Sequence, residues 1–323
     1  MEGGPPLKLL LCFPSADGET GVWIGKALGA LGHEVTAVDP RADLPDVDRA
    51  RERVLASAGG GAFDLILTSR EAHLSAIAPD LARAAPLVGW CLDSRRNIFH
   101  WRPLFPLIRA SRAWFTIAGG NIGELRRTLK KAEIFWLSEG YAEGVHRPVE
   151  LDEPARRRLS AEVAFAGSLG PYYRSNTDRA QVLEALRGAG LDLKVWGSGE
   201  DGVEYLGPQQ HNRMVAGAKI CLGHTSLADV ALSMSARDYR ILGAGGFLLT
   251  NHVAEIETWL EVGREIETYR TPEECVEKAR FYLEHPERRA EIAAAGLAAA
   301  RARHTLRHRL GTMIEILERC GVL

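Results

Sequence analysis

The chain has 323 residues, a length that predicts two domains. Its 40 basic and 42 acidic side chains leave a formal net charge of −2, so no overall electrostatic field draws it to nucleic acid or anionic lipid. Hydrophobic residues make up 46% and charged residues 25%, a composition that excludes a disordered chain and a disulfide-held miniprotein.

The spacing of the cysteines and the length of the apolar runs indicate in which cellular compartment the protein is expected. The five cysteines are scattered and form no CxxC pair, which is typical of reduced thiols in a cytoplasmic protein. The longest apolar runs have the length of a buried strand, far below the roughly 20 residues of a membrane-spanning helix. The first residues lack the basic and apolar regions of a secretory signal. We therefore expect a cytoplasmic protein without a transmembrane segment.

The first half of the chain alternates strand-like and helical segments. Strands are predicted at residues 7–13, 34–38, 63–68, 85–90, 113–118 and 134–137, and helices at 22–31 and 47–58. Strands that alternate with helices at this spacing predict a parallel sheet covered on both faces.

A polar, glycine-bearing segment that ends at Pro148 predicts the connection between two domains, 1–148 and 149–323. The second series has strands predicted at residues 163–167, 191–196, 219–223 and 247–250, and helices at 178–188, 209–216 and 236–242. From residue 272 onward the pattern is helical, with 284–287 as its one clear break. The last helix could pack back on the first domain. The fold class predicted is α/β, with two doubly wound domains facing a central cleft and C-terminal helices.

Ligands of open α/β sheets bind beyond the carboxyl ends of the strands. Residues 14–21 follow the first strand; their glycines permit close approach of a ligand, and the next helix offers N–H groups to an anion. Neither GxGxxG nor GK[ST] spacing is present, and an ordinary turn is an equally open interpretation. Residues 167–176 follow a buried strand and combine small residues, hydroxyls and Arg174, the residue types that a phosphate site requires.

The segment over residues 233–247 is the most informative. Ser235 followed by Asp238 fits a capping box and predicts a helix that begins at Ala236. The positive end of that helix and Arg237 favour an anion, and Arg237 and Arg240 share one helix face, so that both could converge on one anionic group. The alternative is a capped helix with solvated arginines.

Metal and nucleophile motifs are absent from the sequence. The ten histidines do not fall in HExxH or HxH spacing, and no serine sits in a GxSxG elbow. His304 and His308 are expected on a solvated helix face. Arginines interleaved with aromatic residues over 95–114 are expected to cover the sheet, although contact with an anionic acceptor or a membrane surface stays open.

These motifs resemble the CgeB-like branch of the group 1 glycosyltransferases, which have the GT-B fold. The resemblance covers most of the chain. It rests on residues 88–94, 136–148 and 163–174, and most specifically on residues 235–250, with their SxRxYxILGAGGFLLT pattern.

The resemblance implies a nucleotide-sugar donor held mainly by the second domain and an unknown glycan, metabolite or protein acceptor held by the first. It places Gly167, Ser168, Arg174, Ser235 and Arg237 near the donor diphosphate. Leu206 and Gly207 would border the base. Arg240 stands where relatives usually place a glutamate that holds the ribose hydroxyls, and arginine can donate to a ribose oxygen but cannot accept from a hydroxyl.

Sugar transfer leaves negative charge on the departing diphosphate, which a catalyst must stabilise. Arg174, Arg237 and the helix start at Ser235 are expected to do this without a metal or any other cofactor, and the group is usually retaining. If a base is needed, Asp93 and Asp17 are the candidates, each near a strand end of the first domain; either could instead cap a turn. The competing hypotheses are a non-catalytic GT-B protein that binds a sugar nucleotide or a partner, and a nucleotide-sugar epimerase.

Overall fold

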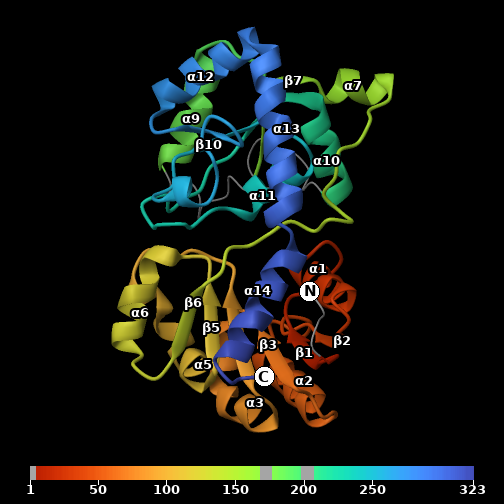
Figure 1. Ribbon diagram of the computed structural model, residues 1–323, viewed down its shortest axis with the longest axis vertical. Coiled ribbons are helices and arrows are strands. Elements are labelled where there is room, and N and C mark those ends of the chain that lie inside the picture. The colour runs from red at the N-terminus through yellow and green to blue at the C-terminus, as the bar shows by residue number, and fades with distance from the viewer. Residues whose placement is uncertain (1–4, 168–176, 198–206) are drawn as a thin grey trace. The chain divides into compact units, whose positions relative to one another are not determined.

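The computed structural model describes residues 5–167, 177–197 and 207–323. The chain folds into two compact units (Figure 1), one made of residues 1–138 and 306–323 and the other of residues 139–305. The segment 139–148, which the sequence assigned to the first domain, therefore belongs to the second unit, and the last helix belongs to the first.

The first unit is built on a parallel six-stranded sheet with the order β2-β1-β3-β4-β5-β6. Its strands are β1 (Lys8–Cys12), β2 (Glu34–Val38), β3 (Leu65–Thr68), β4 (Leu87–Cys91), β5 (Ala113–Thr116) and β6 (Glu133–Trp136). Every residue of β3, β4 and β5 is buried. This explains why the sequence of these strands is continuously apolar instead of alternating.

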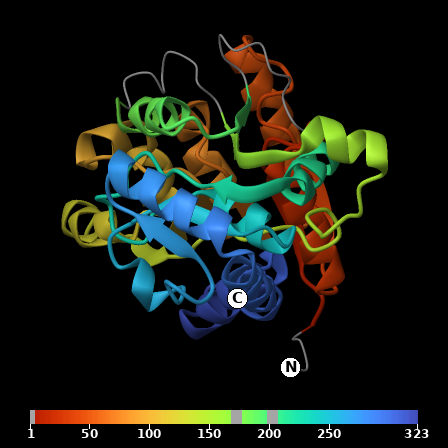
Figure 2. The same ribbon diagram turned by 90° about the horizontal axis from the view of Figure 1, so that it is seen from above.

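Helices cover both faces of this sheet. They are α1 (Thr20–Ala30), α2 (Val47–Gly59), α3 (Ala78–Ala84), α4 (Ile98–Trp101), α5 (Phe105–Ala110), α6 (Ile122–Thr128) and α14 (Leu306–Arg319), with 3-10 turns η1 (Ala72–Ala76), η2 (Arg102–Leu104) and η3 (Gly119–Asn121). Helices α2, α3 and α5 pack on one another in turn, whereas α14 packs on α1. Figure 2 shows α14 nearly end-on beside the C-terminus.

The second unit has a parallel five-stranded sheet with the order β11-β10-β9-β7-β8. Its strands are β7 (Ala161–Ala166), β8 (Leu193–Trp196), β9 (Ala218–Leu222), β10 (Leu248–Asn251) and β11 (Glu267–Tyr269). The chain leaves β7 toward β8 on one side and later returns to β9 on the other side. The two directions separate between β7 and β9, and such a switch point leaves a crevice at the carboxyl ends of the strands.

Two apolar clusters hold helices against opposite faces of this sheet. The helices are α7 (Glu153–Leu159), α9 (Thr177–Gly188), α10 (Pro208–Gly217), α11 (Ala236–Gly243), α12 (Pro272–Glu284) and α13 (Pro286–Arg303), with the 3-10 turn η4 (Ile256–Thr258). One cluster joins α9 and α12 to the strands, and the other joins α10 and α11. Figure 1 shows α9 and α12 on one side of this unit and α10 on the other.

Two elements differ from the sequence prediction. Strand β11 was missed, because Glu267 and Thr268 look polar in sequence although both are buried. The C-terminal helical region has a second break, at His304 and Thr305, in addition to the predicted one near residue 285. His304 is therefore 1% exposed in the link between two helices, and the expectation that it lies on a solvated helix face was wrong.

Candidate functional site

The carboxyl ends of β7 and β9, at the switch point of the second unit, carry the candidate site. Gly167 follows β7, and Gly223 and His224 follow β9. The backbone N–H of Gly167 donates to the Trp196 carbonyl at 2.7 Å, which ties the ends of β7 and β8 together. Backbone atoms of three strands thus end at one edge, where open α/β sheets bind their ligands.

Arg237, in the first turn of α11, bridges two of these strand ends. Its Nε donates to the Ala166 carbonyl, and its Nη1 donates to the His224 carbonyl at 3.1 Å. The guanidinium lies over the Phe165 ring, 4.7 Å from the ring centroid. A methyl group added at Gly167 would lie 2.5 Å from Nη2, so this end of the side chain lies directly beside Gly167.

Arg179 approaches the same point from α9, and the sequence reasoning missed it. It is buried, lies 5.4 Å from the Phe165 centroid, and donates from Nη2 to the His224 carbonyl at 3.2 Å and to Ser226 Oγ at 3.1 Å. Two guanidinium groups therefore flank one phenyl ring, an arrangement in which each cation faces the ring's π-electrons. In the sequence, Arg179 is marked only by its position after Asp178 at a predicted helix start, and this does not indicate that its side chain is buried.

Ser235 caps α11 as predicted, and the helix begins at Ala236. The Ser235 hydroxyl accepts from the Arg237 N–H at 3.3 Å, while the Ser235 N–H donates to Thr225 Oγ1 at 3.2 Å. Thr225 is in turn joined to Asn251 by reciprocal backbone-to-amide bonds of 2.7 and 2.8 Å. The start of α11 is thereby fixed against the ends of β9 and β10.

Asp238, the other residue of the predicted capping box, is fully buried. Neither carboxylate oxygen reaches normal hydrogen-bond geometry with a partner in the described part of the chain, and the Ser235 N–H, the donor expected in the box, donates to Thr225 Oγ1. Burial raises the pKa of Asp238 to about 6, although Arg237, the Ser235 backbone and Arg179 act in the opposite direction. Asp238 is thus a buried carboxyl group close enough to Arg237 and Arg179 for both charges to act on it.

Histidines around this edge are kept neutral. Burial, together with the charges of Arg179 and Arg237, lowers the pKa of His224 to about 3. Its Nδ1 lies 3.2 Å from the Tyr269 hydroxyl, which donates to the Gly223 carbonyl at 3.1 Å. The positive charge at this edge therefore comes from arginine and the helix end.

Arg240, one turn after Arg237, forms an ion pair with the buried carboxylate of Glu139, at 3.3 Å between Nη2 and Oε1. The sequence placed Arg237 and Arg240 on one helix face, and both charges do act on the same ring, that of His211. Arg237 donates to backbone carbonyls, however, whereas Arg240 pairs with a carboxylate.

Three of the predicted donor residues, Ser168, Arg174 and Leu206, lie outside the described residues. Gly207 is described and precedes α10, and its N–H donates to Gln210 Oε1 at 3.1 Å. Of the predicted donor residues that are described, Gly167, Ser235 and Arg237 come together at the switch point.

In the first unit, the two candidate bases differ in their surroundings. Asp93 follows β4, is exposed, and pairs with Arg70 at 2.5 Å between Oδ2 and Nε. Asp17 lies in the exposed loop between β1 and α1, and within the described ranges no hydrogen bond or ion pair involves its side chain. The structure thus shows Asp93 positioned by a cation and Asp17 facing solvent.

The arginine and aromatic residues over 95–114 stack on one another. Arg102 lies 4.6 Å from the Phe99 centroid, and Arg109 lies 5.4 Å from the Phe105 centroid. Trp101 and Trp114 are fully buried, whereas Phe99 is 61% exposed. Trp101, in α4, and Trp114, within β5 itself, are therefore core residues, whereas Phe99 lies at the surface.

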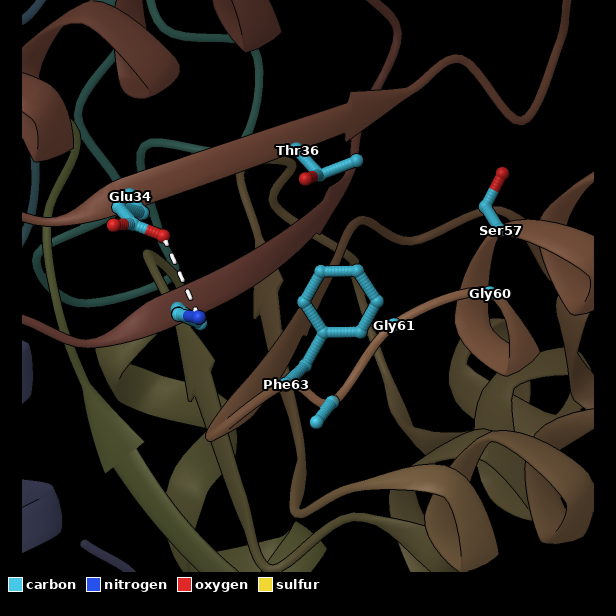
Figure 3. Close-up of a pocket in the computed structure, with 8 residues that line it drawn as sticks. Glu34, Thr36, Ser57, Gly60, Gly61 and Phe63 are labelled. Carbon is cyan, nitrogen blue, oxygen red and sulfur yellow. Dashed lines mark ion pairs between the residues drawn. The ribbon is translucent and has the colours of Figure 1, made fainter.

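A surface depression of about 330 Å³ lies on the first unit, near the amino-terminal ends of β1 and β2 (Figure 3). Lys8 and Glu34 pair across it at 4.0 Å, both largely exposed. It contains none of the predicted site residues. Among the described residues, no cluster of three histidine, cysteine or carboxylate side chains could hold a metal ion, and no helix is long and apolar enough to cross a bilayer.

Residues 174–315 match a family model described as glycosyl transferase-like. No curated protein matches the chain. Among solved structures, HepE from Anabaena, in complex with UDP and glucose, is similar with a TM-score of 0.68 and 12% identity, covering 97% of this chain and 100% of that one.

Two further solved structures show the same fold. Sucrose-phosphate synthase from Thermosynechococcus elongatus has a TM-score of 0.68 at 10% identity, covering 98% of this chain and 100% of its own. A UDP-forming trehalose-phosphate synthase from Burkholderia xenovorans has a TM-score of 0.64 at 10% identity with the same coverage. The predicted GT-B fold is confirmed. The region that matches the glycosyl transferase-like family model, residues 174–315, includes α11 and both arginines of the candidate site.

Proposed function

We propose that this chain is a glycosyltransferase that moves a sugar from a nucleotide-sugar donor to a glycan, metabolite or protein acceptor, with retention and without a metal ion. The observation that carries the proposal is the meeting of Arg237, Arg179 and the start of α11 at the β7/β9 switch point. HepE, bound to UDP-glucose in one structure, makes a UDP-linked sugar the first donor to test. The CgeB-like assignment and a cytoplasmic location belong to the same proposal.

The chemistry follows from where charge develops. Transfer breaks the bond between the anomeric carbon and the diphosphate oxygen, and the electron pair stays on the diphosphate. Arg237 and Arg179 supply fixed positive charge at the switch point, and the first turn of α11 adds its partial positive charge. Hydrogen bonds to backbone carbonyls hold both arginines in place. The two guanidinium groups therefore need not reorganise as the leaving group gains charge. Asp93, oriented by Arg70, is the better-placed candidate if the acceptor hydroxyl requires a base.

The proposal is tested by thermal shift against UDP-, GDP-, dTDP- and CMP-sugars, followed by an assay of donor hydrolysis and transfer. We expect one nucleotide to stabilise the protein and its sugar to be released or transferred. Binding without any turnover would favour the non-catalytic alternative, and isomer exchange without an acceptor would favour an epimerase. Binding of none of these donors would contradict the proposal.

A further inference from the structure

His211 lies in the first turn of α10, with 8% of its surface exposed. Neither ring nitrogen has a hydrogen-bond partner within the part of the chain that the structure describes. Leaving a buried polar group unpaired costs roughly 1–3 kcal/mol, so native proteins almost always supply a partner, including ordered water. The unpaired ring therefore indicates that a polar group absent from the structure binds at the start of α10.

The neighbouring side chains do not provide that partner. The His146 ring meets His211 edge to face, with the centroids 6.1 Å apart, and His146 Nδ1 accepts from the Ala142 N–H at 3.3 Å. Glu139, which could accept a proton, is paired with Arg240. The segment 139–146 thus packs against His211 without a hydrogen bond to it.

The charge around His211 is positive. Burial first, and then the charges of Arg240 and Arg237, lower the pKa of His211 to about 3. The ring is neutral at physiological pH, so one nitrogen carries a hydrogen to donate and the other keeps a lone pair. A donor N–H near two guanidinium groups favours an anionic oxygen as its partner.

The fold brings these groups to one edge. Helices α10 and α11 both belong to the layer on one face of the second sheet, and both begin at the carboxyl ends of its strands. His211 in the first turn of α10 and Arg237 in the first turn of α11 therefore approach the same edge of the sheet. This is also the edge at which the proposed donor diphosphate would bind beside Arg237.

We propose that His211 contacts the donor nucleotide and donates its ring N–H to a phosphate oxygen of the nucleoside diphosphate. This inference rests on the proposed function and names a residue that sequence motifs do not reveal. Phosphate recognition at this edge then combines fixed positive charge with one neutral, directional donor. Such a donor selects for an oxygen at one position, which charge alone does not do.

The first experiment measures UDP binding by calorimetry in the wild type, His211→Phe and His211→Gln, with His285→Gln as the matched control. His285 is exposed at the far end of α12, stacked on Phe281. We expect the Kd for UDP to rise at least tenfold in both His211 variants and to stay unchanged in His285→Gln. Thermal unfolding of each variant establishes that it is folded.

The second experiment needs no substitution at the site. In the wild type labelled with 15N-histidine, UDP and inorganic pyrophosphate should shift the ring nitrogens of His211, assigned by their loss in His211→Phe, and uridine should not. A UDP Kd within twofold of the wild type in folded His211→Phe, ring signals that UDP leaves in place, or a shift produced by uridine would each overturn the inference. In these cases the wild type still binds UDP and the proposed function stands, whereas a wild type that binds no nucleoside diphosphate overturns both.

Discussion

At the scale of single residues, Arg237 and Arg179 join the strand ends of the second unit to the candidate site. Both donate to the His224 carbonyl, and both lie against the Phe165 ring. The same hydrogen bonds that hold the loop after β9 also fix the positive charge at the switch point. Substitutions here are therefore expected to affect stability and donor use together.

Replacing Arg237 with alanine should reduce kcat/KM for the donor at least tenfold, because a lost charged hydrogen bond costs roughly 1.5–3 kcal/mol. It should also lower Tm, since the Ala166 carbonyl loses the Arg237 donor and the His224 carbonyl keeps only Arg179 of its two arginine donors. Arg264→Ala serves as the control, because Arg264 is exposed and pairs with Glu261 on the surface. Wild-type turnover in folded Arg237→Ala would remove Arg237 from the mechanism.

Gly167→Ala tests the position of Arg237 without changing any charge. The added methyl group would lie 2.5 Å from Arg237 Nη2 and 2.9 Å from the Phe165 ring, so the guanidinium must move. We expect weaker donor binding, seen as a higher KM, with a smaller loss of stability than Arg237→Ala causes. An unchanged KM would mean that donor binding does not depend on this placement of the guanidinium.

The sequence predicted part of this site for identifiable reasons. Ser235 and Arg237 were found because a helix cap has a local signature that survives without tertiary information. Arg179 was missed because its burial depends on β9 and on Phe165, both distant in sequence. The motif predicts Asp238 as a cap partner, but its complete burial follows from packing that the motif does not specify.

At the scale of elements, the buried strands were predicted most reliably, because continuous apolar runs identify strands covered on both faces. Strand β11 was hidden because buried Glu267 is satisfied by Lys278 at 3.0 Å and by the Tyr282 hydroxyl at 2.6 Å, partners supplied by α12. The break between α13 and α14 has neither glycine nor proline, so no local signal marks it. Close packing of α13 on α11 depends on one small residue.

Gly296→Ala, in the middle of α13, should destabilise the protein by roughly 1–3 kcal/mol, as overpacking of a core contact does. The added methyl group would meet the Glu265 carbonyl and lie 2.8 Å from Leu242 Cδ2. Gly311→Ala, inside α14 and with no atom within 4 Å of the added methyl group, should instead stabilise by about 0.5–1 kcal/mol. Urea unfolding measures both, and a stabilising Gly296→Ala would refute the close α11–α13 contact.

At the scale of the whole molecule, buried titratable groups determine how stability depends on pH. The pKa values of His146, His211 and His224 are lowered to about 3, so below pH 6.5 the unfolded chain binds protons that the folded chain does not. Their effect on the free energy of unfolding is small above pH 6.5. The protein loses stability as the pH falls from 6.5 toward 3. Asp238 acts in the opposite direction: its raised pKa makes the folded state bind the extra proton between about pH 4 and 6.

The three histidines outweigh the single aspartate, because each costs about 1.4 kcal/mol one pH unit below 6.5. We expect Tm to fall by roughly 5 °C or more between pH 7.5 and 5.5. Asp238→Asn should steepen this fall, since it removes the opposing group. A Tm that is constant or rises on acidification would contradict the buried, neutral state of these histidines.

The most direct test of the account is the release of sugar from a panel of nucleotide-sugar donors, UDP-linked sugars first, by the wild type and by Arg237→Ala in the presence of EDTA. We expect turnover of one donor by the wild type that EDTA leaves unchanged and that falls at least tenfold in Arg237→Ala. A wild type that releases no sugar from any donor, or a folded Arg237→Ala variant with full turnover, would contradict the claim that arginines at the β7/β9 switch point stabilise a departing diphosphate.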